Sequence, residues 1–255
     1  MLTVHALAGG FLELDRQSMI PDGPATRWTV PVLCTLVTHP RGRLLFDTGI
    51  HCLAMTDPEG LLGERAKYFG FHTKPGEDVI SQLERLGVAP ADVDVVANSH
   101  FHFDHCGANE SFPAARFLVQ KRELDAARAT LTTPSPTYRP NAKSFDHPLR
   151  YEAIDGEHDV FGDGSAVLVP TYGHTPGHQS LVVKHGRDRI VFTADAVYTR
   201  ENLDRDVVPG IVWDAAEMTR SFASLRAMRD RQGATLYYGH EPAQWPDRAA
   251  FPARV

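Results

Sequence analysis

The chain has 255 residues, of which 26 are basic and 32 acidic, and its net charge of −6 is spread without any basic block. This balance disfavours nucleic acids and anionic membranes as partners. No apolar run approaches the ~18 residues that a membrane span needs.

The length, the cysteines and the N-terminus point to one intracellular domain. The chain is long enough for one large domain with a buried core, and no linker-like segment divides it, so we expect a single domain over 1–255. Three cysteines without CxxC spacing favour a reducing cytoplasm over a disulfide framework. The first residues lack the basic start and the apolar core of a signal peptide.

Apolar runs and turn residues predict the elements of the first half. Residues 11–28 are expected to be irregular, and the long connection 51–76 carries several apolar side chains. The predicted elements are, in chain order, a strand over 3–7 that ends in a Gly-Gly turn, a hairpin of strands 30–37 and 43–46, a helix over 76–86 that ends at Gly87, strands 93–98 and 116–120, and a helix over 121–128.

The second half repeats the pattern of strands followed by one long helix. Residues 130–150 contain four prolines and are expected to form a loop that walls a pocket. A capping box at Asp214–Glu217 starts a helix whose Met218, Phe222, Leu225 and Met228 form a core-facing stripe up to Gly233. The predicted strands are 166–171, 179–183, 189–194 and, last, 234–238.

The stretch 99–107, Ser-His-Phe-His-Phe-Asp-His-Cys-Gly, follows a predicted buried strand. Its candidate ligands are His100, His102, Asp104 and His105. In an extended chain the first three side chains point to one side, and His105 turns back beside Asp104. Imidazole and carboxylate are ligands that zinc and similar ions prefer, so this loop is predicted to bind metal. Cys106 is interpreted as a small buried side chain.

Three further candidates stand where other strands end: His174, Asp195 and His240. With the first four they are enough for two metal ions. One ion would take His100, His102 and His174, the other Asp104, His105 and His240, and Asp195 would bridge them. His178 is interpreted as a support for the ligands or as structural, and Asp47 as a residue that orients a ligand.

The motif H-x-H-x-D-H, the GHTPGH loop, an aspartate after a strand and a final Gly-His together resemble the metallo-β-lactamase superfamily, from about Val30 to His240. The resemblance implies an α/β (α+β) fold, a four-layer αβ/βα sandwich of two mixed sheets flanked by helices. It places the metals at one edge, between the sheets.

The segment 195–202, Asp-Ala-Val-Tyr-Thr-Arg-Glu-Asn, is similar to that of the N-acyl-homoserine lactonases, which are quorum-quenching lactone hydrolases. In that family a tyrosine three residues after the bridging aspartate contacts the substrate carbonyl, and Tyr198 has that position here. A tyrosine that only packs on the core is the alternative. The sequence departs from the family mainly in 51–75 and 130–150, the segments that would shape the acyl pocket.

The expected activity is ring opening by a hydroxide held between two divalent metals, most simply zinc, with cobalt, iron or manganese also compatible. Tyr198 would stabilise the oxyanion, and Asp104 would pass a proton to the leaving alkoxide. The expected partner is a small-molecule lactone, and the resemblance suggests a homodimer.

Other interpretations remain open at this point. A hydrolase of γ-butyrolactone, another small lactone or an ester would use the same site. Three enzymes of the same fold fit the chain less well. A glyoxalase-II-like thioesterase would be expected to have a C-terminal extension, a tRNA-processing nuclease a basic surface, and a true β-lactamase its usual ligand changes. None of these features is seen in the sequence. A non-catalytic metal-binding module is the alternative from another class, although structural zinc sites usually have four ligands, often cysteine.

Overall fold

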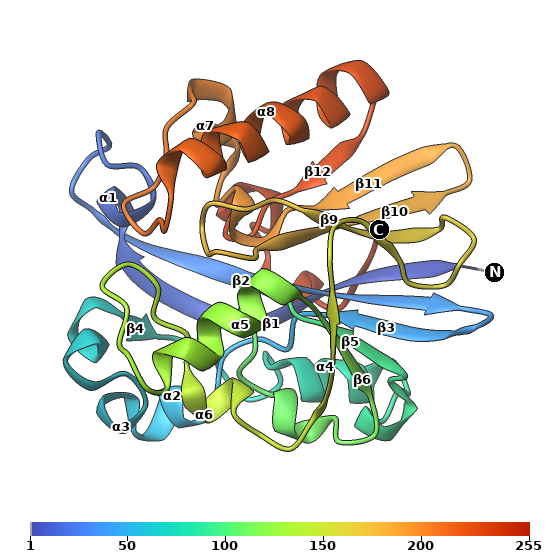
Figure 1. The fold of residues 1–255 in the computed structure, drawn as a ribbon, viewed down its shortest axis with the longest axis horizontal. Coiled ribbons are helices and arrows are strands. Elements are labelled where there is room, and N and C mark those ends of the chain that lie inside the picture. The colour runs from blue at the N-terminus through green and yellow to red at the C-terminus, as the bar shows by residue number, and fades with distance from the viewer. Residues whose placement is uncertain (1) are drawn as a thin grey trace.

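The apolar runs of the sequence form the strands of two mixed β-sheets in the computed structural model, which describes residues 2–255 (Figure 1). The first sheet contains, in spatial order, β13 (Ala253–Arg254), β1 (Thr3–Asp15), β2 (Arg27–His39), β3 (Gly42–Phe46), β5 (Val95–Ala97), β6 (Arg116–Gln120) and β7 (Arg150–Ile154), with β4 (Gly70–Phe71) also paired to β1. The second contains β12 (Thr235–Tyr237), β11 (Asp188–Phe192), β10 (Gln179–His185), β9 (Ala166–Pro170) and β8 (His158–Asp159).

Helices cover the outer surfaces of both sheets. The α-helices are α1 (Arg16–Met19), α2 (Leu53–Thr56), α3 (Pro58–Leu62), α4 (Val79–Arg85), α5 (Lys121–Thr130), α6 (Ala142–Phe145), α7 (Arg200–Arg205) and α8 (Ala215–Gln232). Short 3₁₀ helices are η1 (Gly63–Tyr68), η2 (Pro90–Asp92), η3 (Asn109–Ser111), η4 (Ala194–Ala196), η5 (Pro242–Gln244) and η6 (Arg248–Ala250). None of the helices in the described part of the chain has both the length and the apolar character of a membrane span.

The core includes three apolar layers that follow from the alternation of side chains along the strands. Between the sheets, side chains of the first sheet such as Phe46 pack with Leu181 and Phe192 of the second. On the outer face of the second sheet, Phe222 and Leu225 of α8 are fully buried, as the predicted stripe requires. The α4 helix covers the first sheet in the same way. The resulting order of helix, sheet, sheet and helix confirms the predicted four-layer sandwich.

The N-terminal strand differs from the prediction. The Gly-Gly pair forms no turn, because β1 continues to Asp15 through a β-bulge between Ala8 and Phe11. A Cβ on Gly9 would lie 2.6 Å from both the Cys34 Sγ and the Gly49 Cα, so this glycine permits a close approach of two backbones inside a strand. Residues 11–15, expected to be irregular, are therefore part of the sheet.

The predictions for the later strands also need correction. The strand over 234–238 corresponds to β12 but is not the last, because β13 pairs antiparallel with β1. The strand β7 begins at the last residue of the predicted loop 130–150 and was not predicted, because its mostly exposed residues lack the apolar alternation of a half-buried strand. The short helix α6 lies inside that predicted loop. The hairpin of β2 and β3, the helices α4, α5 and α8, and the strands β5, β6, β9, β10 and β11 agree with the predictions within a few residues at each end.

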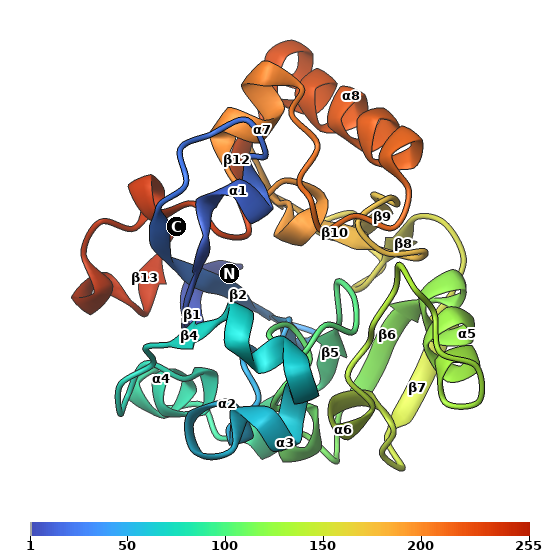
Figure 2. The ribbon, with the colours of Figure 1, turned by 90° about the vertical axis from the view of Figure 1, so that its left-hand side faces the viewer.

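The ends of several strands meet at one end of the sandwich. Figure 2 views the molecule from this end, with α1 and α7 above the centre of the view and α2 and α3 below it. The loops that follow β5, β9, β11 and β12 all belong to this region, and they carry the candidate metal ligands.

Candidate metal centre

The motif loop follows β5, which lies in the middle of the first sheet between β3 and β6. Its position is fixed at Ser99, whose backbone N–H and hydroxyl donate to the two oxygens of Asp47 at 2.6 and 2.7 Å. Asp47 itself directly follows β3 and adopts a φ of +63°, a strained conformation for a residue with a side chain. The loop then turns at a hydrogen bond from the His105 N–H to the His102 carbonyl, 3.1 Å, which brings His105 back toward Asp104.

The remaining candidates come from the second sheet. His174 lies in the loop between β9 and β10, Asp195 lies in η4 directly after β11, and His240 follows β12. The structure thus brings all seven predicted ligands together from both sheets, in two groups whose ligand atoms lie within 4.8 Å of one another. All seven side chains are buried except that of His102, which is partly buried.

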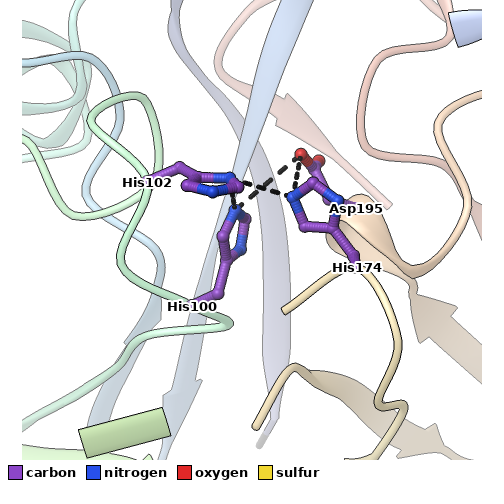
Figure 3. Close-up of side chains that lie close together, drawn as sticks. All are labelled: His100, His102, His174 and Asp195. Carbon is purple, nitrogen blue, oxygen red and sulfur yellow. Dashed lines mark hydrogen bonds and ion pairs between the residues drawn. The ribbon is translucent and has the colours of Figure 1, made fainter. Parts of the chain in front are cut away.

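The first group contains His100, His102, His174 and Asp195 (Figure 3). The His102 Nδ1 lies 3.0 Å from the His100 Nε2 and 2.9 Å from the His174 Nε2, so three ring nitrogens face one point. One oxygen of Asp195, Oδ2, lies 3.3 Å from the His174 Nε2 and 3.8 Å from the His100 Nε2.

The second group contains Asp104, His105 and His240. The other oxygen of Asp195, Oδ1, lies 3.1 Å from the Nε2 atoms of both His105 and His240. The Asp104 Oδ2 lies 3.7 and 3.8 Å from the same two nitrogens. Asp195 therefore turns one carboxylate oxygen toward each group, which is the arrangement that a bridging ligand requires.

The outer nitrogens of His105, His174 and His240 lie beside hydrogen-bond acceptors. The Nδ1 atoms of His174 and His240 lie 3.1 and 2.9 Å from the carbonyls of Ile211 and Pro31, and that of His105 lies 2.9 Å from the Asp47 Oδ2. Because a carbonyl can only accept, the Nδ1 atoms of His174 and His240 each carry a proton, and their Nε2 atoms point into the groups. These contacts orient the rings of His105, His174 and His240 with the Nε2 atoms directed into the groups.

Burial and neighbouring charges set the protonation of the site. Burial lowers the pKa of His102 and of His174 to about 3, so both rings are neutral at pH 7. Burial works against protonation of His105 as well, but the charges of Asp195 and Asp104 raise its pKa well above the usual value. Although burial disfavours its charge, the pKa of Asp195 is well below the usual value because of His105 and His240.

The residues fit two divalent ions by their chemistry. Imidazole nitrogens and carboxylate oxygens directed at one point are the donors that borderline metals take. The His105 Nε2 and the Asp195 Oδ1 are buried atoms that have no hydrogen-bond partner among the described residues. Buried polar atoms of this kind need a partner, and a metal ion would supply it.

A cavity of about 630 Å³ opens onto this centre. His102, Asp104, Asp195 and His240 line it together with Tyr198. The Tyr198 hydroxyl lies 3.4 Å from the His174 Nδ1, and burial raises its pKa well above the usual value, so it stays protonated as a hydrogen-bond donor. The segments around 65–69 and 136–139 also line the cavity, as expected for a pocket wall.

His178 and Cys106 lie beside the two groups but belong to neither. The His178 Nδ1 lies 2.9 Å from the Thr171 hydroxyl, and its ring is centred 5.2 Å from that of His100. Cys106 is fully buried, and its thiol lies 3.2 Å from the His102 carbonyl, so it has the environment of a small core residue.

One important residue was missed at the sequence level. Glu123, fully buried on α5, accepts hydrogen bonds from the Phe101 N–H, the Tyr138 hydroxyl, the Thr175 hydroxyl and the Gly177 N–H. It therefore connects the motif loop to the loop that carries His174. Its place beside the apolar Leu124 and Ala127 on the same helix face was the available signal, since a charge on a core-facing position needs internal partners.

Comparison with known proteins agrees with this geometry. Residues 27–240 match the family model described as the metallo-beta-lactamase superfamily. The chain belongs to this superfamily. The match covers the whole span from β2 to His240, so it includes all seven residues of the two groups.

Curated relatives show to which branch of the superfamily the chain belongs. The chain is 34% identical to the N-acyl homoserine lactonase AttM of Azorhizobium caulinodans, over 96% of this chain and 95% of that one. It is 29% identical to an N-acyl homoserine lactonase of Bacillus cereus, over 99% and 98%. Within the superfamily, the chain is therefore a member of the lactonase branch, as the sequence motifs indicated.

Solved structures have the same fold. An N-acyl homoserine lactone hydrolase, with the product N-hexanoyl-L-homoserine bound at its catalytic metal center, superimposes with a TM-score of 0.86. That structure is 26% identical in sequence and covers 99% of this chain and 98% of its own.

Proposed function

We propose that this protein is a metal-dependent hydrolase that opens the lactone ring of N-acyl homoserine lactones. The observation that carries the proposal is the convergence of seven ligand-type side chains, in two groups bridged by Asp195, on a cavity that Tyr198 also lines. The 34% identical AttM relative and the product-bound structural neighbour support this choice of substrate.

The two groups would each hold one divalent ion. His100, His102 and His174 would ligate the first, Asp104, His105 and His240 the second, and Asp195 both. When bound, two such ions activate water and polarise the ester carbonyl. We propose zinc, because five imidazoles and two carboxylates match its preference, while cobalt, iron and manganese suit the same donors.

Two side chains of the protein would take part in the reaction, one by stabilising negative charge and the other by transferring a proton. The Tyr198 hydroxyl is a protonated donor at the cavity wall, so it would donate to the carbonyl oxygen as negative charge develops there. Burial raises the pKa of the Asp104 carboxyl, which suits it to carry a proton to the leaving alkoxide as the ring opens. The surrounding apolar walls would exclude bulk water from these groups.

The protein is proposed to act in the cytoplasm and as a homodimer, without a nucleic-acid partner. Its three cysteines are all free, which suits a reducing compartment, and the net charge of −6 disfavours nucleic acid. Light scattering on a sizing column measures the mass in solution, and a mass of one chain would contradict the homodimer.

Acid release in a pH-stat tests the activity. Metal-loaded protein is given hexanoyl and decanoyl homoserine lactones, γ-butyrolactone, an aryl ester, a glutathione thioester and a β-lactam. We expect ring opening of the acyl homoserine lactones that a chelator abolishes. Activity on γ-butyrolactone or the aryl ester alone would change the assigned substrate. No activity on any compound of the panel, with two metals bound, would refute the proposal.

A further inference from the structure

Cationic side chains are concentrated in the wall of the cavity that leads to the metal centre. Arg27, Arg65, Lys67 and Arg139 all line it. Two of them have their own counter-ions, because Arg27 lies 3.0 Å from Glu13 and Lys67 lies 3.3 Å from Glu64. Within residues 2–255, no carboxylate lies within 4.0 Å of the guanidinium group of Arg65 or of Arg139.

The positive charge of Arg139 acts on Arg65 within the cavity. Partial burial and the positive charge of Arg139 lower the pKa of Arg65 from its usual value. Arg65 and the candidate ligand His102 line the same cavity. Arginine remains protonated at neutral pH, so two like charges share this part of the cavity. An anion between them would remove the repulsion and supply the missing counter-charge.

The pair lies on two segments that contact each other. Arg65 belongs to η1, and Arg139 to the connection between α5 and α6. The Asn141 side-chain amide, two residues after Arg139, donates to the carbonyl of Leu61 at 3.3 Å, four residues before Arg65. This buried hydrogen bond joins the two segments that carry Arg65 and Arg139 in the cavity wall.

Apolar side chains complete the wall. Leu12 and Leu14 of β1, Phe69, and Ile211 and Val212 of the connection between α7 and α8 line the same cavity. Its volume of about 630 Å³ is in the range of pockets that enclose a small-molecule ligand. The wall thus offers an apolar path from the metal centre and a pair of unneutralised cations beside it.

We propose that this cavity selects lactones whose acyl group has a short methylene stem and ends in a carboxylate, which Arg65 and Arg139 bind. This inference rests on the proposed lactonase function and names the substrate class within it. The carboxylate that ring opening itself creates is a second source of the same chemistry, so the test separates the acyl carboxylate from the product carboxylate.

The experiment compares two substrates of equal shape on the metal-loaded protein at low salt. One is homoserine lactone acylated with adipic acid, which leaves a free terminal carboxylate, and the other has a carboxamide in place of that carboxylate. We expect kcat/KM to favour the carboxylate by roughly tenfold to a hundredfold, the range for hydrogen bonds to charged groups. The preference should fall in Arg65→Gln and, separately, in Arg139→Gln, and it should weaken as salt is added.

Arg187→Gln is the matched control, because it removes the same charge from an exposed residue in the turn between β10 and β11. The ratio of kcat/KM between the two substrates should stay the same in this variant. If Arg187→Gln lowers the ratio as much as Arg65→Gln does, the preference reflects net charge alone, and the proposed site is wrong.

The remaining outcomes separate this inference from the function on which it rests. Opening of the carboxamide and of hexanoyl homoserine lactone, with no preference for the carboxylate, would overturn the inference and leave the lactonase function intact. In Arg65→Gln, the ratio of kcat/KM between the two substrates could stay unchanged while product inhibition weakens. That result would assign the arginines to the product carboxylate, and it would also overturn the inference. No ring opening of any of these lactones would refute both.

Discussion

The Asp47 carboxylate accepts hydrogen bonds from the Ser99 N–H, the Ser99 hydroxyl and the His105 Nδ1–H. The Ser99 hydroxyl gives its only proton to Asp47, so its oxygen, 2.9 Å from the His100 Nδ1, can accept a hydrogen bond from that ring. One buried carboxylate therefore orients a histidine in each of the two groups. Such supporting residues fix the tautomer and direction of the ligands.

Tyr198→Phe tests the role of the tyrosine hydroxyl. Loss of one donor to a developing oxyanion costs about 10²–10³ in turnover, and we expect a decrease of that size at most in kcat for hexanoyl homoserine lactone. The bound metal, measured by elemental analysis, should remain unchanged because Tyr198 belongs to neither ligand group. Equal kcat in the variant and the parent would leave Tyr198 as a packing residue.

Asp104→Asn separates ligation from proton transfer. The amide keeps an oxygen that can still approach the site, but it cannot carry a proton to the leaving alkoxide. We expect the variant to retain part of its metal and lose most of its turnover. Elemental analysis and the pH-stat rate, measured on the same sample, check this. A variant as active as the parent would remove Asp104 from the mechanism.

The helix α5 carries no candidate ligand but supports the loops that do. Its Glu123 accepts two hydrogen bonds at each carboxylate oxygen, from the motif loop, from the loop after β9 and from Tyr138. The approach is close, since a Cβ on Gly177 would lie 2.1 Å from the Glu123 nitrogen. The helix and the two ligand loops are thus connected through one buried anion.

Glu123→Gln should destabilise the protein although it preserves size. One carboxylate oxygen becomes an amide nitrogen, which faces two donors and leaves both without an acceptor. Each unsatisfied buried donor costs about 1–3 kcal/mol, so we expect the free energy of unfolding to fall by about 2–5 kcal/mol. Urea unfolding of the variant and the parent measures the change.

Glu84→Gln is the matched control for this substitution. Glu84 is an exposed residue of α4, and surface changes of this kind usually alter stability by less than about 0.5 kcal/mol. If the two variants unfold at the same urea concentration, the hydrogen bonds of Glu123 contribute nothing to the fold.

An ion-pair cluster links α7 to α8. Asp204 lies 2.6 Å from Arg229 and 3.0 Å from Arg200. Burial would raise the pKa of Asp204, but hydrogen bonds from these two arginines lower it below its usual value. A carboxylate with a lowered pKa in the folded state stabilises the fold above its unfolded pKa and loses this contribution as pH falls through the lowered value.

Asp204→Asn should therefore cost less than about 1 kcal/mol at neutral pH, because exposed ion pairs contribute little. The difference from the parent should shrink toward zero as the pH falls below the usual carboxyl range. Urea unfolding of both proteins at pH 7 and at lower pH values measures this. A difference that grows on acidification would contradict the assignment of the shift to these arginines.

Across the whole molecule, the four-layer sandwich and the convergence of the candidate ligands were predicted from the sequence better than the strands at the edges of the first sheet and the bulge in β1. Strands with apolar periodicity and the ligands at their ends follow from local patterns, which a single chain displays. The bulge at Gly9–Gly10 was missed because a glycine pair inside a strand looks like a turn when its packing partner, Gly49, is distant in sequence. The pairing of β13 with β1 is invisible for the same reason.

The polar network around the ligands was predictable only in part. Asp47 was found because it ends a strand, whereas Glu123 lies in a helix whose charged residues mostly face solvent. Arg65 lies in the short 3₁₀ helix η1 and Arg139 in a loop, and neither segment has a periodicity that shows which side chains face inward. Their proximity depends on the tertiary contact between Asn141 and Leu61.

The central claim is that seven residues from both sheets hold two metal ions that ring opening requires. The most direct test strips the protein of metal and returns zinc stepwise, while the rate on hexanoyl homoserine lactone is followed. The rate should rise until two equivalents are bound and then stay constant, and His102→Ala should abolish this gain. Full activity without metal, or a rate that saturates at one equivalent, would contradict the claim.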